Sequence, residues 1–395
     1  MKIVLIHNFY RVRGGEGTHF LQMKTLLEKK GHTVLTYCRD SREVDDYSML
    51  KRALVPVKNI YSLKTYRQIR NMVLSEKPDI AQIYHVTPLI SPSVFYALHR
   101  LNIPVIQVLQ NYRYLCLNGV FQDPQGNICE LCTQKGLWHA VPKKCYRNSF
   151  VQTSAVAASL YIHRKLNTYI KNIDLFITTS AFLKNKLISN GFPEDRTITI
   201  SGFTEAAEIK PRFRPDPYIV YMGRLSSEKG LLTLLKALRE LPHIQLKIMG
   251  DGPIRSRMEA YLSEEGMNNV KFLGYVSGEK RFDILKRAKC MVIPSECYDN
   301  FPFGVLESLA LGTPVIGSRM GGIPEQIEDG KTGFLFQAKN HQQLREKIEK
   351  IFSDETLSIS MRRNARMSAL NKFSQETAYQ RFMEIYRDLI ELKEK

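Results

Sequence analysis

The chain has 395 residues, 44% of them apolar and 24% charged, which is typical of a globular protein and long enough for two domains of roughly 150–200 residues. No apolar run approaches the ~18 residues of a membrane-spanning helix, and the run at residues 3–6 is too short for a signal peptide, which argues against integral membrane and secreted proteins. The net charge of +18 is concentrated in residues 1–205, where 27 Lys and Arg stand against 14 Asp and Glu; such an excess suits an anionic membrane or nucleic acid, or serves only solubility.

In the first half of the chain, predicted strands alternate with predicted helices. Strands are expected at residues 2–8, 32–37, 80–84, 105–109 and 175–179. A loop at residues 9–17 contains Gly14 and Gly15, and a helix at 18–30 follows it. The backbone amides of such a loop can approach a phosphate, although adjacent glycines are not the GxGxxG dinucleotide fingerprint. The alternation predicts a doubly wound, mostly parallel sheet.

Residues 45–75 combine basic and apolar side chains in a segment expected to be loop and helix. A basic amphipathic helix with aromatic neighbours suits a membrane surface. An ordinary surface helix is the alternative. We expect a cytoplasmic protein, with peripheral contact to the inner face of an anionic membrane as a further prediction.

Four of the seven cysteines form a C-x12-C-x2-C-x12-C pattern in a loop-rich insertion, residues 116–145. They are Cys116, Cys129, Cys132 and Cys145. Four thiolates that include a CxxC pair suit a tetrahedral structural zinc site. Four unlinked reduced cysteines are the alternative, because an odd total fits a reducing compartment better than a set of disulfides.

The second half repeats the alternation after a linker rich in proline and arginine, residues 202–217. Strands are expected at residues 218–222, 245–249, 270–273, 290–294, 313–317 and 333–336. These predict a second doubly wound sheet with its own core. Residues 376–395 have the apolar spacing of an amphipathic helix.

Two cations follow the first strand of this second sheet. Arg224 and Lys229 flank the strand end, where α/β sheets bind ligands, and both side chains suit phosphate oxygens. Gly252 lies in a tight turn after the next strand. No Asp-x-Asp motif occurs in the chain, so we expect no catalytic divalent metal, with the two cations and a helix N-terminus neutralising a diphosphate instead.

The stretch 293–317 runs from a buried strand through a turn-rich loop into a short helix. Free N–H groups are expected near the helix start, residues 303–306, where they form an anion site. Asp299 precedes the helix and Glu307 lies one turn inside it. Glu307 can reach a ribose diol, and Asp299 lies where a hexose on the phosphates would be. An ordinary strand–loop–helix with both acids in solvent is the alternative.

In this order, these motifs resemble the retaining glycosyltransferases of family 4, which have the GT-B fold. The resemblance covers nearly the whole chain and is carried by the Gly14–Gly15 loop, residues 223–230, 250–252, 290–317 and 321–325. It implies two Rossmann-like domains facing across a cleft that holds a nucleotide-sugar. The expected domains are residues 1–205, joined by a C-terminal helix at 376–395 that crosses back, and residues 206–375.

Carried over by position, the resemblance assigns Glu307 to the ribose and Asp299 to hexose hydroxyls. Arg224 and Lys229 are assigned to the diphosphate. The remaining donor contacts that it implies are Gly14 and Gly15 from the first domain, Gly223, Gly252, Val276 beside the base, and the backbone amides of Phe301, Phe303 and Gly304. The chain departs from the family at Asp299, where the family has Glu, and at Gln110-Asn111, where the family often has His. His85 is the nearest histidine to that position, and we expect a structural role for it.

The implied reaction moves a hexose from a nucleotide-diphosphate-sugar, most often a UDP-sugar, to a hydroxyl of a saccharide or polyprenyl-linked acceptor. Configuration is retained, and bacterial surface-polysaccharide synthesis is the expected setting. A nucleotide-sugar epimerase of the same fold is the alternative. A basic, zinc-bearing nucleic-acid binder would leave the carboxylates and cations without a role, so we expect no nucleic-acid partner.

Overall fold

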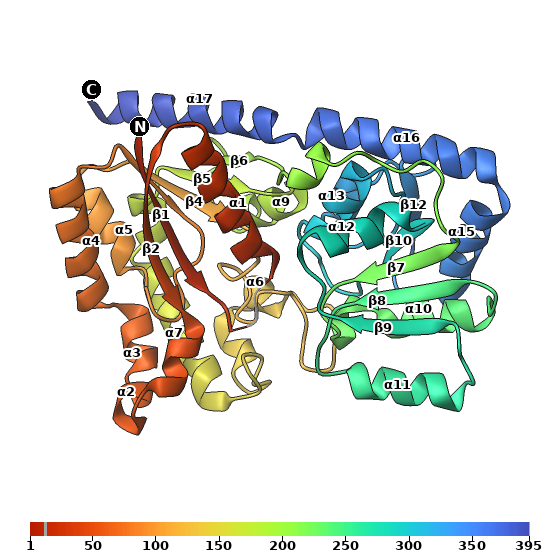
Figure 1. Ribbon diagram of the computed structural model, residues 1–395. Coiled ribbons are helices and arrows are strands. Elements are labelled where there is room, and N and C mark those ends of the chain that lie inside the picture. Colours follow the sequence, from red (N-terminus) through yellow and green to blue (C-terminus); the bar gives the residue numbers. More distant parts are fainter. Residues whose placement is uncertain (12–13, 395) are drawn as a thin grey trace. The chain divides into compact units, whose positions relative to one another are not determined.

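The computed structural model describes residues 1–11 and 14–394. It divides into two compact units, Met1–Ser201 with Ala378–Lys395, and Gly202–Thr377. In the described residues each unit contains one six-stranded sheet whose strands are all parallel (Figure 1). The expected pair of Rossmann-like domains is therefore confirmed.

The sheet of the first unit has the order β2-β1-β3-β4-β5-β6. Its strands are β1 (Lys2–Phe9), β2 (Thr33–Asp40), β3 (Ile80–Ile83), β4 (Val105–Leu109), β5 (Leu175–Thr178) and β6 (Thr197–Thr199). The central strands β1, β3 and β4 are mostly apolar and are buried apart from the two ends of β1, because helices cover both faces of a parallel sheet. The order reverses between β1 and β3, so the carboxyl ends of these strands form the topological switch point where such sheets bind ligands. The short edge strand β6 was not predicted.

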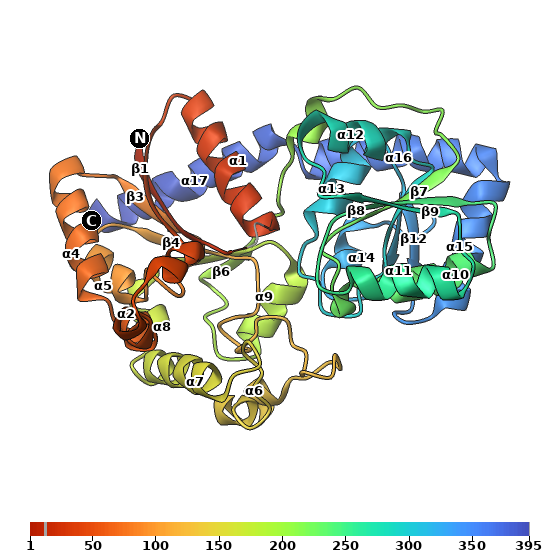
Figure 2. The ribbon, with the colours of Figure 1, turned by 60° about the horizontal axis from the view of Figure 1, so that its bottom comes forward.

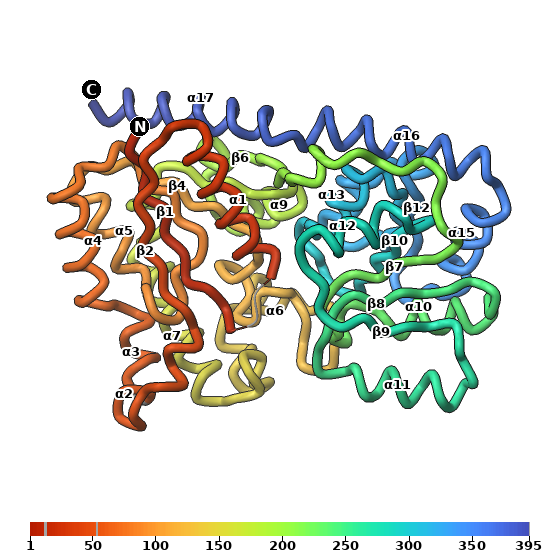
Figure 3. The backbone as a smooth tube through the Cα atoms, in the orientation of Figure 1, coloured from red at the N-terminus to blue at the C-terminus, as the bar shows by residue number. Residues whose placement is uncertain are grey.

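In the part of the chain that the structure describes, ten α-helices belong wholly or mainly to this unit. They are α1 (Gly15–Lys29), α2 (Met49–Ala53), α3 (Val55–Ile60), α4 (Leu63–Glu76), α5 (Ser93–Arg100), α6 (Leu131–Gln134), α7 (Phe150–Lys165), α8 (Thr168–Asn172), α9 (Ala181–Ile188) and α17 (Gln375–Glu394). The basic segment is three short helices, visible as separate coils in Figure 3. Pro56 lies in the first turn of α3, where its missing N–H is tolerated and a new helix can begin.

The C-terminal helix α17 packs on the first unit, as the resemblance implies. Tyr386 on α17 is fully buried and its hydroxyl donates to Gln82 on β3. Tyr379 bonds His32 at 2.9 Å, and Lys393 forms a 2.9 Å ion pair with Asp174 ahead of β5. Helix α17 therefore has polar contacts with the sheet region at three places: just before β2, on β3 and just before β5.

The sheet of the second unit has the order β12-β11-β10-β7-β8-β9. Its strands are β7 (Tyr218–Met222), β8 (Gln245–Met249), β9 (Val270–Gly274), β10 (Cys290–Ile293), β11 (Val315–Ser318) and β12 (Gly333–Phe336). Its helices are α10 (Leu231–Arg239), α11 (Arg255–Glu264), α12 (Gly278–Arg287), α13 (Phe303–Ala310), α14 (Ile323–Gln326), α15 (His341–Ser353) and α16 (Glu355–Lys372). Two apolar cores fill the two faces: α10, α11 and α15 cover one, and α12, α13 and α16 cover the other (Figure 2).

Among the described residues, no helix is both long enough and apolar enough to cross a bilayer.

The strand order of the second sheet reverses between β7 and β10. The two loops that follow these neighbouring strands, residues 223–230 and 294–302, contain five of the twelve predicted donor-site residues: Gly223, Arg224, Lys229, Asp299 and Phe301.

Candidate functional site

Lys229 and Asp299 meet at the switch point of the second sheet. Lys229 follows β7 at the end of the 3-10 turn Ser227–Lys229, and Asp299 follows β10. Their Nζ and Oδ2 atoms lie 2.6 Å apart, and the Ser295 hydroxyl donates to the same oxygen at 2.9 Å. Burial by itself lowers the pKa of Lys229, but the charge of Asp299 and the hydrogen bond to it, together with Cys297 and Tyr221, hold that pKa above its usual range. The site therefore keeps a positive charge beside a carboxylate.

Two glycines let the loops around this pair approach closely. Gly230 has φ +67°, and a Cβ there would lie 1.9 Å from the carbonyl oxygen of Pro294. Gly321 has φ +60°, and a Cβ there would lie 2.3 Å from the carbonyl oxygen of Asp299, whose backbone also accepts from the amide of Gly322 at 2.8 Å. The Gly321–Gly322 turn thus supports the backbone of Asp299, because only glycine tolerates both the φ angle and the contact.

Glu307 lies in α13 and is almost fully buried, with 3% of its surface exposed. Its Oε1 is 3.0 Å from Nη2 of Arg281 on α12. Burial raises the pKa of Glu307 to about 7, although the charge of Arg281 acts in the opposite direction. A carboxyl with this pKa changes charge near neutrality, which is common at functional sites.

The other residues assigned to the donor lie around these two ion pairs. Arg224 is exposed beyond the end of β7, and Gly252 packs so closely that a Cβ there would lie 2.3 Å from the carbonyl oxygen of Leu225. Pro302 is the N-cap of α13, and a helix start leaves its first N–H groups without intrahelical partners. Phe301, Phe303 and Gly304 lie there, as predicted, while Gly223 and Val276 end β7 and precede α12.

Gly14 and Gly15 lie in the first unit, apart from the residues above. Helix α1 begins at Gly15 with Gly14 as its N-cap, three residues earlier than expected. The predicted loop therefore ends at Gly14, and residues 12 and 13 of it lie outside the described residues. A Cβ at Gly14 would meet nothing within 4 Å, so packing inside the protein does not explain this glycine.

The four cysteines of the insertion are reduced and lie in one neighbourhood. A hydrogen bond from Cys132 lowers the pKa of the Cys116 thiol. Burial, and then the charges of Cys116 and Cys129, raise the pKa of Cys145. Within residues 1–11 and 14–394, however, no group of three or more His, Cys, Asp or Glu side chains is arranged to hold a metal ion. Zinc at these cysteines stays a prediction.

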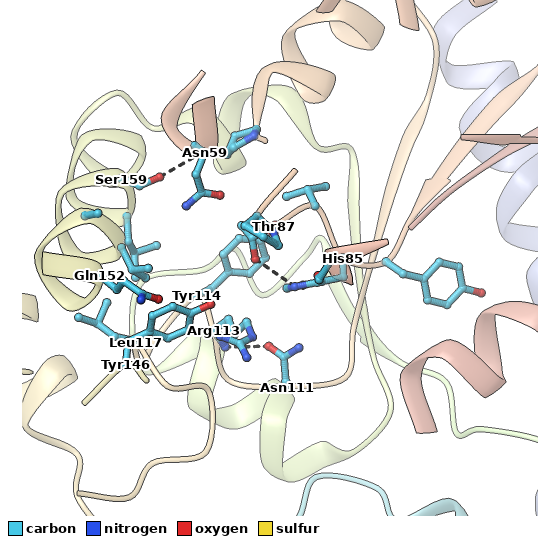
Figure 4. Close-up of a pocket in the computed structure, with 18 of the residues that line it drawn as sticks. Asn59, His85, Thr87, Asn111, Arg113, Tyr114, Leu117, Tyr146, Gln152 and Ser159 are labelled. Atoms are coloured by element: carbon cyan, nitrogen blue, oxygen red, sulfur yellow. Dashed lines mark hydrogen bonds between the residues drawn. The ribbon is translucent and has the colours of Figure 1, made fainter. Parts of the chain in front are cut away.

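The first unit contains a cavity of about 140 Å³ at the carboxyl ends of β3 and β4. In Figure 4, Arg113 and Asn111 lie together near His85, and Asn59, Gln152 and Ser159 line another wall. Burial lowers the pKa of His85 well below its usual value, so the ring is neutral, and its Nε2 is 3.0 Å from the Thr87 hydroxyl. This supports the expected structural role of His85.

Sequence reasoning missed four residues of these two sites. Arg281 is 26 positions from Glu307, and no local pattern marks it. Ser295 follows a predicted strand, a position that could have identified it. Arg113 and Glu16 come from separate segments that only the folded chain brings to one cavity.

Two family models match the chain. Residues 13–207 match the model described as Glycosyltransferase Family 4, and residues 203–368 match the one described as Glycosyl transferases group 1. The chain is 29% identical to an alpha-D-kanosaminyltransferase of Streptomyces kanamyceticus over 47% of its length and 50% of that protein. It is 26% identical to an uncharacterized glycosyltransferase of Methanocaldococcus jannaschii, MJ1178, over 55% and 60% of the two chains. The chain thus spans about half the length of these relatives.

Solved structures share the fold over nearly the whole chain. Anabaena Alr3699/HepE in complex with UDP covers 98% of this chain and 100% of its own, with a TM-score of 0.69 and 18% identity. Sucrose-phosphate synthase from Thermosynechococcus elongatus covers 99% of both chains, with a TM-score of 0.74 and 18% identity. At this identity, the likeness concerns the fold.

Proposed function

Because residues 13–207 and 203–368 match the two consecutive domain models of these enzymes, the chain belongs to the glycosyltransferases of the GT-B fold, and we propose that it transfers a hexose from a nucleotide-diphosphate-sugar with retention of configuration. The observation that carries the proposal is the arrangement at the switch point of the second sheet. There the loop after β7, which contains Arg224 and Lys229, meets the loop after β10, which contains Asp299 and leads into α13 with the buried Glu307. Cations and a helix N-terminus suit a diphosphate, and a buried carboxylate suits a diol.

In this mechanism, Lys229 and Arg224 bind the diphosphate, Asp299 accepts hydrogen bonds from the hexose, and Glu307 accepts from the ribose hydroxyls. The acceptor oxygen forms a bond to the anomeric carbon from the face that the diphosphate leaves. The bond from that carbon to the diphosphate oxygen breaks, and the departing diphosphate takes the hydroxyl proton. Lys229 stabilises the charge that develops on this oxygen, which is usually a large catalytic contribution.

UDP is our first choice of nucleotide, since Alr3699/HepE was solved with UDP and with UDP-glucose. A thermal-shift panel of UDP, GDP and ADP with their glucose conjugates tests this on the full chain. Ligand at about 100 times Kd stabilises by about 2.7 kcal/mol. We expect one nucleotide series to raise the Tm; no shift with any nucleotide, alone or as its conjugate, would contradict the proposal. Proton NMR of the product then determines the configuration.

We further propose a lipid-linked saccharide acceptor, surface-polysaccharide synthesis and peripheral contact with the inner face of a membrane. One curated relative is the lipopolysaccharide core biosynthesis glycosyltransferase LpsE of Rhizobium meliloti, 24% identical over 55% of this chain. The excess of cations in residues 1–205 supports attraction to anionic lipid. Sedimentation with anionic liposomes tests the contact, and recovery of all the protein in the supernatant would contradict it. An epimerase would need no acceptor, and nothing in the structure favours that alternative.

The pKa of Glu307 predicts a pH dependence of donor binding. Its folded-state pKa is raised to about 7, so the carboxyl is largely protonated at pH 6 and ionised at pH 8. The ribose diol donates to the ionised form, so we expect nucleotide affinity to rise with pH across this window. Calorimetric Kd values at pH 6, 7 and 8 check this. The Glu307→Gln variant has no such titration, so its nucleotide affinity should change less with pH. If the affinity of both proteins changes equally with pH, a group other than Glu307 causes the pH dependence.

Structural zinc at Cys116, Cys129, Cys132 and Cys145 is a separate proposal, supported by their spacing and their shared neighbourhood. Elemental analysis of protein purified without chelators should find about one zinc per chain. Cys129→Ser should remove it and Cys38→Ser, in an exposed cysteine outside the insertion, should not. Metal below about a tenth of an equivalent in the wild type would end this proposal.

A further inference from the structure

Two cavities in the first unit adjoin each other and share seven wall residues. The 140 Å³ cavity described above shares Arg113, Arg147, His85 and four further residues with a neighbouring cavity of about 200 Å³. Tyr10 and Asn118 line the neighbouring cavity alone. The combined space lies where β3 and β4 end, beside the switch point of the first sheet.

The neighbouring cavity is polar and positively charged. Nε of Arg113 donates to the Tyr10 hydroxyl at 3.1 Å, and among the described residues no carboxylate lies within ion-pair distance of Arg113 and no protein acceptor is recorded for its Nη groups. Arg147 is the second cation of the wall. The nearest acid, Glu16, accepts from Asn111 at 2.7 Å instead. A guanidinium fork open to a cavity suits the oxygens of a phosphate or carboxylate.

The 140 Å³ cavity has largely apolar walls. Its walls include Val44 and Val86, together with Val55 and Pro56 of α3 and Val156 and Leu160 of α7. Of its polar side chains, Gln107 donates to the carbonyl of Tyr84 at 2.6 Å and Ser159 donates to that of Asn59 at 3.5 Å, while Oδ1 of Asn59 and Oε1 of Gln110 are buried and have no hydrogen-bond partner among the described residues. Such a space favours a hydrocarbon segment over a sugar, because a sugar needs hydrogen-bond partners for every hydroxyl.

Helices α3 and α7, which pack side by side, also carry apolar side chains outside the cavity (Figures 1 and 3). Leu54 and Val57 are 49% and 62% exposed, and Phe150 and Val151 are 56% and 70% exposed. Lys51, Arg52 and Lys58 lie beside the first group and Arg147 beside the second. Apolar side chains among cations suit the boundary of an anionic bilayer, from which an amphiphile can enter.

We propose that this space binds an anionic lipid as the acceptor, with its phosphate on Arg113 and Arg147 and its hydrocarbon chain between α3 and α7. This rests on the proposed transferase function and specifies the acceptor class. It requires both parts of the ligand: neither an inorganic anion nor a neutral prenyl alcohol fills both halves.

Farnesyl monophosphate is the probe, measured by calorimetry on the full chain with the donor site saturated by UDP. We expect it to bind at least about tenfold more tightly than inorganic phosphate and than farnesol. If inorganic phosphate binds as tightly as farnesyl monophosphate, the hydrocarbon chain contributes nothing and the site binds only anions. If farnesol binds as tightly as farnesyl monophosphate, the phosphate contributes nothing and Arg113 does not bind the ligand. Either result overturns the proposal.

Two variants locate the binding. Arg113→Gln should weaken farnesyl monophosphate about tenfold to a hundredfold, whereas Arg67→Gln, in an exposed residue of α4, should not. Ala155→Trp on α7 fills the apolar half and should abolish the advantage of the farnesyl chain while inorganic phosphate binding persists. The Tm shift by UDP reports folding and the donor site in every variant. If that shift is present and farnesyl monophosphate does not bind, this inference fails alone; if UDP also gives no shift, the proposed function fails.

Discussion

Replacing Glu307 by Gln is expected to weaken nucleotide binding by about 30-fold to 100-fold at pH 8. The substitution keeps the volume and the hydrogen-bonding capacity of the side chain and removes only its charge. Hydrogen bonds to a charged acceptor contribute about 1.5–3 kcal/mol, and losing part of two such bonds gives this range. Calorimetric titration with the nucleotide that shifts the wild type measures the change.

Glu346→Gln is the matched control, because Glu346 is an exposed acid on α15, away from the site. We expect it to bind as the wild type does. The Tm of Glu307→Gln should stay near that of the wild type, since the loss of the pair with Arg281 is offset by the removal of a buried charge. Unchanged affinity in Glu307→Gln would place the ribose elsewhere.

Replacing Lys229 by Met is expected to lower kcat by about 10²-fold to 10³-fold. Removing one group that stabilises charge in the transition state typically costs about this much. The variant also leaves the half-buried Asp299 with the Ser295 hydroxyl but without its cation, so stability falls too. Initial rates of nucleotide release with donor and acceptor present give kcat and KM separately.

The double variant Lys229→Met/Asp299→Asn separates the two effects. It removes the unpaired carboxylate, so it should recover much of the lost stability while kcat stays low. Lys236→Met, in an exposed lysine of α10, controls for the loss of a positive charge. Recovery of kcat together with stability in the double variant would show that Lys229 acts on the fold alone.

The proposed donor site could be assembled from the sequence because each of its parts is local. Strands that end at Met222 and Ile293, followed by polar loops, indicate the switch point of a parallel sheet without any knowledge of the packing. Glu307 and Asp299 lie within one loop and helix, so their spacing could be interpreted directly. The parallel pairing of the strands and the burial of the central ones follow from the same alternation, whereas the order of the strands does not.

Contacts between distant segments could not be predicted in this way. Arg281 reaches Glu307 from a neighbouring helix, and this contact depends on how α12 and α13 pack. Arg113 and Glu16 line one cavity although nearly 100 residues separate them. The sequence predicts loop and helix for residues 45–75, and the structure has three helices at 49–76. Pro56 lies in the first turn of α3, and hydrophobic spacing does not show where such a helix begins.

Hydrogen–deuterium exchange of the full chain, with and without UDP, GDP or ADP, tests the donor site most directly. Amides that contact a bound nucleotide exchange more slowly. We predict that one nucleotide slows exchange in peptides covering residues 223–230 and 295–307, and that the slowing is lost in Glu307→Gln at the same nucleotide concentration. Binding of a nucleotide that leaves both peptides unchanged would contradict the assignment of the switch point in the second sheet as the donor site.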